Sequence, residues 1–205
     1  RVPDKLAIDT YDGQAWIGVI PFQITNLSAR GLPTLPGLRT FPEINVRTYV
    51  RHKGRPGVYF FSLDVPNAPA VITARLTYHL DYYLAKSSIR RDDDWVHFKS
   101  ERKPGDESFP IRFEGRYRPN GKPFQAEPGS LEHFLTERYC LFAEDFRGDI
   151  HRGDIHHLPW PLQRARADIP VNTMTTPLEL SLIGRDPVFL FADRLEALFW
   201  VAQRC

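Results

Sequence analysis

Apolar and polar side chains alternate along several stretches of this chain, which is the pattern of β-strands that bury one face. Residues 44–52 alternate most clearly. One face of this predicted strand carries Ile44, Val46, Thr48 and Val50, and the other carries Asn45, Arg47, Tyr49 and Arg51. Residues 14–24 alternate in part, and residues 95–100 and 111–117 are also strand-like. The pattern therefore predicts a mainly β protein.

Turn and helix signals separate these strands. Residues 53–57 join the strand at 44–52 to the apolar run at 58–63, which predicts a β-hairpin, and residues 118–123 form a second turn. One short helix is predicted to begin at Asn67, with Pro69 in its first turn. A second covers residues 131–136 with Ser130 as its cap.

Strands at this density with few helices predict a mainly β (α+β) fold, namely a curved antiparallel β-barrel formed by a single domain over residues 1–205. No linker divides the chain. The loop at residues 28–40 contains Pro33 and Pro36 and is the best candidate for a flap over a pocket.

Composition excludes several function classes. The 205 residues carry 27 basic and 25 acidic side chains, which are interspersed, so no polybasic stretch indicates a nucleic-acid or membrane partner. No window of about 18 apolar residues predicts a membrane span. Cys140 and Cys205 form no disulfide framework and have no metal-ligand spacing. We therefore expect a cytoplasmic protein of bacterial type that has no cofactor. Its expected partner is a small-molecule ligand, and a homo-oligomer is a further possibility that the sequence leaves open.

Residues 41–86 resemble the acetoacetate decarboxylase superfamily. Its members carry a glutamate, a strand pair, an Asn-x-Pro-Ala helix start, an arginine and a final Pro-Lys-Lys. Glu43, the helix start at 67–70 and Arg75 fall in register with this pattern. Asp81, Tyr82 and Tyr83 stand at the positions of the proline and the two lysines.

Other motifs resemble the YqjF-like branch of that superfamily, which has no established activity. They are residues 41–50 (FPEINVRTYV), 128–132 (PGSLE), 136–139 (TERY), 156–161 (HHLPWP) and 172–174 (NTM). The resemblance implies the superfamily's fold and a start inside the domain, after the family's first elements. It also implies strands at residues 188–203, where the spacing of Leu195, Leu198 and Phe199 alone suits a helix.

The segment Arg-Gly-Asp-Ile-His occurs twice in succession, at residues 147–151 and 152–156. A repeat of five residues is too short for a repeat architecture, and it predicts a hairpin in which both glycines allow tight backbone geometry. His156 or the adjacent His157 either lines a pocket or is a structural imidazole.

The resemblance implies a site but not its usual chemistry. In the resembling decarboxylases a lysine forms a Schiff base with a β-keto acid, and a phenol such as that of Tyr82 cannot form an imine. Lys86 would face the same way as Tyr82 on a strand and is the one nearby substitute. A second family acid falls among residues 19–22 (VIPF) and is therefore lost.

Two charged residues allow more than one interpretation. Glu43 either carries a proton to a ligand or pairs with Arg47 or Arg75 inside the sheet. Arg138 either binds a ligand carboxylate or closes a structural ion pair with Glu137 or Glu132.

Two main function classes follow. The first is a protein that binds a small anionic or oxo-acid metabolite in the barrel. The second is an enzyme that uses Glu, Tyr or His acid-base chemistry on an oxo-acid, by enolisation, hydration or dehydration, without a Schiff base. A purely structural role is the third alternative. The catalytic candidates are Glu43, Tyr82 and Lys86, and the ligand-binding candidates are Glu43, Arg47, Arg75, Tyr82, Arg138, His156 and Trp160.

Overall fold

The computed structural model describes residues 1–26, 40–67, 79–102, 109–180 and 186–205. The strands are β1 (Ala7–Ile8), β2 (Ile17–Thr25), β3 (Thr40–His52), β4 (Arg55–Val65), β5 (Tyr82–Asp92), β6 (Trp95–Arg102), β7 (Arg112–Pro119), β8 (Cys140–Glu144), β9 (Ile150–His157), β10 (Gln163–Asn172), β11 (Leu190–Phe191), β12 (Ala197–Phe199) and β13 (Gln203–Arg204). The helices are α2 (Leu131–Thr136) and the 3-10 helix η1 (Thr176–Leu178). All these strands belong to one sheet, so the prediction of a mainly β fold is confirmed.

The predicted hairpin is β3 and β4. Its turn is shorter than expected: His52 pairs with Arg55, so Lys53 and Gly54 alone form the loop, both with positive φ. Gly57 lies inside β4, where a Cβ would come within 2.8 Å of the backbone oxygen of Cys140. The glycine therefore serves the close approach of β8 rather than the turn.

β4 is the branch point of the sheet. β3 runs along one of its edges, and two strands share the other edge: β8 pairs with Val58 and Tyr59, and β5 pairs with residues 63–65. Both of these pairings are parallel, whereas the other strand pairs of the described residues are antiparallel. The prediction of an antiparallel barrel holds for each hairpin but not at β4, because its two partners arrive through long connections that allow a parallel direction.

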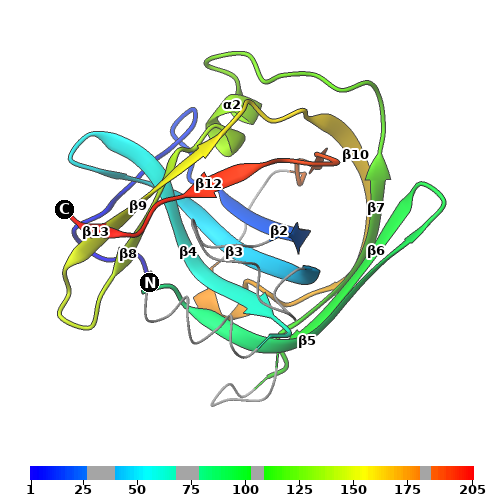
Figure 1. The fold of residues 1–205 in the computed structure, drawn as a ribbon, viewed down its shortest axis with the longest axis horizontal. Helices are drawn as coiled ribbons and strands as arrows, with labels where there is room; N and C mark the ends of the chain where they lie inside the picture. The colour runs from blue at the N-terminus through cyan, green and yellow to red at the C-terminus, as the bar shows by residue number, and fades with distance from the viewer. Residues whose placement is uncertain (27–39, 68–78, 103–108, 181–185) are drawn as a thin grey trace.

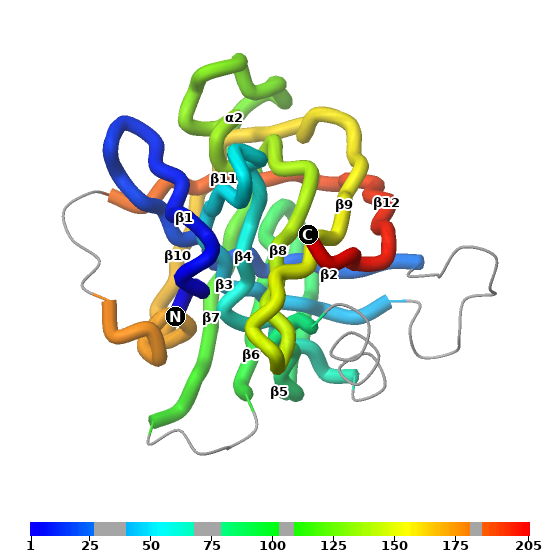
Figure 2. The backbone as a smooth tube through the Cα atoms, turned by 90° about the vertical axis from the view of Figure 1, so that its left-hand side faces the viewer, coloured from blue at the N-terminus to red at the C-terminus, as the bar shows by residue number. Residues whose placement is uncertain are grey.

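The two branches curl the sheet into a barrel-like shape (Figure 1). One continues from β5 through β6 and β7 to β10 and β11, and forms a wall around β2 and β3. The other continues from β8 to β9, whose outer edge pairs with β12 and β13. α2 lies at one end of the molecule in both views (Figures 1 and 2).

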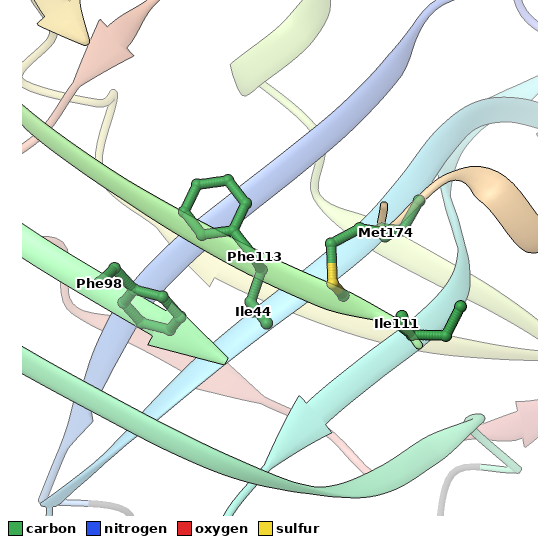
Figure 3. Close-up of a cluster of buried hydrophobic side chains, with 6 residues drawn as sticks. Ile44, Phe98, Ile111, Phe113 and Met174 are labelled. Atoms are coloured by element: carbon green, nitrogen blue, oxygen red, sulfur yellow. The ribbon is translucent and has the colours of Figure 1, made fainter. Parts of the chain in front are cut away.

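Side chains pack on both faces of β3. On one face Ile44 and Val46 meet residues of β6, β7 and the segment after β10 (Figure 3). This cluster also contains Phe98, Ile111, Phe113 and Met174. On the other face Tyr49 packs with Val58, Leu63 and Leu141, against Phe134 and Leu135 of α2. The strand is thus buried from both sides.

The helix predicted at residues 131–136 is confirmed as α2, and the Ser130 side chain accepts a hydrogen bond from the His133 backbone N–H. The strands implied at residues 188–203 are confirmed as β11, β12 and part of β13. The helix expected from Asn67 and the candidate flap lie almost entirely outside the described residues. None of the helices within the described ranges is long and apolar enough to span a membrane.

The repeated segment is only in part the predicted hairpin. Residues 147–149 of its first copy lie in the turn between β8 and β9, with Gly148 at φ 77°, and Ile150 and His151 begin β9. Its second copy lies inside β9, and Gly153 there pairs with Leu141. A Cβ at Gly153 would lie 3.3 Å from the Leu141 side chain, so this glycine is a packing residue.

Candidate functional site

One face of β3 presents a row of polar side chains. Alternation places Glu43, Asn45, Arg47 and Tyr49 on this face, opposite to the core residues Ile44 and Val46. Glu43 is only 3% exposed and Asn45 5%. We call this the Glu43 face. It carries more buried polar groups than a strand interior usually does, which makes it the candidate site.

Tyr82 joins this face from β5. Leu63 of β4 pairs with both Asn45 and Tyr82, so the three residues form a row across the sheet. The Tyr82 hydroxyl donates a long hydrogen bond of 3.4 Å to Oε2 of Glu43. The two positions that the resemblance assigns to the family's acid and its Schiff-base lysine therefore lie in contact.

Glu43 has an unusual protonation state. Burial raises its pKa to about 8, against the opposing effect of hydrogen bonds from the Asn45 and Tyr82 side chains, and the negative charge of Asp64 raises it further. In the described part of the chain no cation forms an ion pair with this carboxyl group. At pH 7 most molecules therefore carry a neutral Glu43, which can donate a proton.

Arg47 does not pair with Glu43, so the predicted Glu43–Arg47 pair is wrong, while the alternative pair with Arg75 lies outside the described residues. Its Nη2 donates to the backbone oxygen of Leu135 at 3.1 Å, and its guanidinium lies 5.8 Å from the centre of the Tyr49 ring. Its Nε is buried and has no hydrogen-bond partner within the described ranges. A cationic donor on the Glu43 face thus remains available to an anion.

Arg138 is held by the protein itself. Its Nη1 lies 2.7 Å from Oδ2 of Asp9, and its Nε donates to the backbone oxygen of Phe134. Asp9 also pairs with Arg51. Burial is the largest single influence on the pKa of Asp9 and raises it. The hydrogen bonds and charges of Arg51 and Arg138 together outweigh burial, so the pKa of Asp9 is lowered. The prediction that Arg138 binds a ligand is therefore replaced by a structural ion pair. Its partner is Asp9 rather than Glu137 or Glu132.

His156 and Trp160 lie apart from Glu43 in the described contacts. His156 is exposed on β9, because its neighbour His157 points inward, and this exposure argues against a ligand contact. The buried His157 contacts the backbone oxygens of Leu158 and Arg138, as a structural imidazole does. Trp160 packs edge-on against His157, and its backbone N–H donates to Glu137. These residues form a separate cluster after β9.

Of the two remaining candidates, the structure describes only Lys86. Lys86 is exposed on β5, opposite Glu101 of β6, and does not lie in the apolar surroundings that a nucleophilic amine needs. Arg75 lies outside the described residues.

Sequence reasoning missed a buried ion pair on the other side of the sheet. Arg102 binds Asp64 through Nε and Nη2, at 2.9 and 2.8 Å, and its guanidinium lies 3.8 Å from the centre of the Tyr83 ring. The signal was present, because Arg102 follows Val96, Phe98 and Ser100 on the inward face of β6. These contacts give Tyr83 a structural role distinct from that of Tyr82.

Solved structures define the class of fold. The chain aligns over its full length with an acetoacetate decarboxylase (TM-score 0.62, 14% identity, 79% of that chain). It also aligns over its full length with an acetoacetate decarboxylase-like enzyme from Sphingomonas wittichii RW1 (TM-score 0.57, 12% identity, 84% of that chain). A third match is the enduracididine biosynthesis enzyme MppR complexed with pyruvate (TM-score 0.52, 10% identity, 82% of this chain and 68% of that one). The protein therefore has an acetoacetate decarboxylase-like fold.

Sequence comparison then identifies the family. Residues 1–196 match DUF2071, whose description is "Uncharacterized conserved protein", and the chain belongs to this family. It is 47% identical over 203 residues to "Uncharacterized protein YqjF" of Bacillus subtilis (strain 168), covering 99% of this chain and 82% of that protein. The resemblance to the YqjF-like branch is confirmed.

Proposed function

We propose that this protein binds a small anionic metabolite, such as an oxo-acid, on the Glu43 face without forming a Schiff base. The observation that carries the proposal is that one face of β3 presents both a buried, largely neutral Glu43 and an Arg47 whose Nε has no hydrogen-bond partner in the described structure. A guanidinium with a free donor favours a carboxylate, and a neutral carboxyl group on the same face of β3 does not repel one.

The absence of an imine rests on Tyr82. This residue contacts Glu43 from the position that the resemblance gives to the reactive lysine, and a phenol has no nitrogen with which to condense with a carbonyl group. We therefore expect no decarboxylation of acetoacetate above background. If the wild-type protein releases carbon dioxide and Lys86→Ala does not, Lys86 is the catalyst. If both proteins release it, another mechanism operates. Either result contradicts the proposal.

The known relatives support this ligand class. One solved structure with this fold, MppR, contains pyruvate, a 2-oxo acid, and others are acetoacetate decarboxylases, whose name gives a 3-oxo acid as substrate. Because these structures are at most 14% identical to this chain, their similarity establishes the fold alone. Arg47 and Glu43 of this chain are the residues that support binding of an anion.

Calorimetric titration with a panel of short carboxylates, including 2-oxo and 3-oxo acids, tests the proposal. A hydrogen bond to a charged group contributes about 1.5–3 kcal/mol, so Arg47→Met should weaken binding by about tenfold or more. Arg90→Met is the control, because Arg90 is exposed at the other end of β5. The proposal fails if no carboxylate binds at millimolar concentration, or if the two variants bind equally well and both remain folded.

A second candidate is an enzyme that moves a proton to or from a carbon next to a carbonyl group. The observation that favours it is the pKa of about 8 for Glu43, raised by burial, since a general acid or base works best with a pKa near the working pH. Exchange of deuterium into a bound oxo-acid, followed by NMR, would detect enolisation. If Glu43 is the base, the rate should rise with pH up to about 8 and be lost in Glu43→Gln. Exchange equal to the background would exclude this reaction and leave the binding proposal standing.

A further inference from the structure

The Glu43 face contains three buried polar atoms that have no hydrogen-bond partner among the described residues. They are Nε1 of Trp16, Oδ1 of Asn45 and Nε of Arg47. Buried polar atoms without partners are uncommon, because each one loses its hydrogen bond to water and gains nothing in return. Three on a single face, without partners in the described part of the chain, are what a bound polar ligand would complete.

Strand register brings the three residues together. Gly18 of β2 pairs with Arg47, and Ile20 pairs with Asn45, so alternation places Trp16 on the same face, across from Tyr49. Trp16 packs there against the cluster that contains Tyr49. The unpartnered atoms therefore come from two adjacent strands and from one side of the sheet.

The residue across from Arg47 on β2 is a glycine. The three atoms nearest to a Cβ built on Gly18 would be two side-chain atoms of Ile20, at 3.4 and 3.6 Å, and the Cγ atom of Arg47, at 3.6 Å. A larger residue at this position would therefore pack against the Arg47 side chain from β2. The glycine places no side chain of its own against Arg47.

The chemical types of the three atoms specify what they need. The indole N–H of Trp16 and the Nε–H of Arg47 are donors, so they require an acceptor. The side chain of Asn45 hydrogen-bonds to Glu43 with its other end, and its buried Oδ1 requires a donor. A ligand that completes this face must therefore carry an acceptor and a donor.

We infer that the ligand is a short hydroxy acid or the enol form of an oxo-acid. Its carboxylate accepts hydrogen bonds from Arg47 and Trp16, and its hydroxyl group donates to Oδ1 of Asn45. Asn45 and Arg47 are two residues apart on one strand, about 7 Å between Cα atoms, which suits a chain of about three or four carbons. A ketone has no donor and would leave Asn45 unpaired. This inference rests on the proposed binding of an anion at the same face.

The test compares matched acids that differ only at one carbon: 3-hydroxybutyrate, butyrate and acetoacetate, and the corresponding set of lactate, propionate and pyruvate. In the native protein, the better of the two hydroxy acids should bind at least about tenfold more tightly than its deoxy analogue, because a site that hydrogen-bonds a hydroxyl group rejects a ligand that lacks it. Asn45→Ala should reduce this preference to less than about threefold. Asn120→Ala, at an exposed residue after β7, should leave it unchanged.

A second variant separates the two halves of the site. Trp16→Phe keeps an aromatic ring but removes the N–H, so it should weaken all the carboxylates by a similar factor and leave the hydroxyl preference intact. The comparison in the native protein decides the matter even if Asn45→Ala does not fold. Binding of carboxylates without a hydroxyl preference, or a preference that survives in folded Asn45→Ala, would overturn this inference alone. Failure of every carboxylate to bind would overturn the proposed function together with it.

Discussion

Replacement of Glu43 by glutamine should change how the stability of the protein depends on pH. In the unfolded chain the Glu43 carboxyl group titrates near its ordinary pKa of 4.5, whereas burial raises the pKa to about 8 in the folded protein. Between these two pH values only the folded state keeps the proton. Because the folded state then binds more protons than the unfolded state, the free energy of unfolding must fall as pH rises.

The size of the effect follows from the two pKa values. Each unit of difference corresponds to 1.36 kcal/mol, so the wild-type protein should lose about 4 kcal/mol from this one group between pH 4.5 and 8. This contribution is fully present below pH 4.5 and lost as pH passes 8. A glutamine at position 43 has the same shape and no proton to lose, so Glu43→Gln should lack this loss.

Urea denaturation at pH 5, 6, 7 and 8 measures the difference between the two proteins and cancels the titration of all other groups. Glu101→Gln is the matched control, because Glu101 is exposed on β6 and its loss should leave the pH dependence as in the wild type. If the wild type and Glu43→Gln lose equal stability over this range, Glu43 is charged in the folded protein. A neutral Glu43 at this site would then be ruled out.

Three further predictions concern the buried groups and the position of the absent lysine. Arg138→Met should destabilise the protein by about 3–5 kcal/mol by leaving Asp9 with one arginine, and the double variant with Asp9→Asn should recover part of this in denaturant titrations. Gly57→Ala should lower the melting temperature markedly, because the new Cβ would lie 2.7–2.8 Å from atoms of β8. If the variant melts at the same temperature as the wild type, β4 and β8 are less close than described. Tyr82→Lys in a Glu43→Gln background places an amine at the lysine position, and borohydride with a 2-oxo acid should trap an adduct there, read by mass spectrometry. Labelling spread evenly over the exposed lysines would contradict the alignment.

The sequence predicted the local parts of the fold because local rules govern them. Alternation and turn residues are sufficient for the β3–β4 hairpin, and a serine cap is sufficient for α2. The two parallel neighbours of β4 depend on contacts between distant segments, which no short pattern encodes. The prediction of an antiparallel barrel was therefore correct in fold class, but it missed the two parallel pairings of β4.

The same distinction explains the errors at the site. Alternation in β3 correctly separates Ile44 from Glu43, but alternation alone does not decide whether the polar face is buried. That face is buried because α2 and the neighbouring strands cover it. Arg138 was assigned by sequence proximity to Glu137 or Glu132, whereas its partner Asp9 lies 129 residues away. Neither burial of a polar face nor a distant ion pair can be inferred from residue spacing.

The residue at position 82 links the altered chemistry of this face to the protonation of Glu43. An ammonium group at that position, in contact with the carboxyl group, would stabilise the negative charge and hold the glutamate pKa low. The hydroxyl group of Tyr82 supplies one long hydrogen bond and no charge, and Arg47 donates to Leu135 instead of Glu43. Burial therefore dominates and the carboxyl group keeps its proton. Under the proposed function, a tyrosine instead of a lysine at position 82 excludes an imine and also leaves a neutral acid on this face, and both fit recognition of an oxygen-bearing anion.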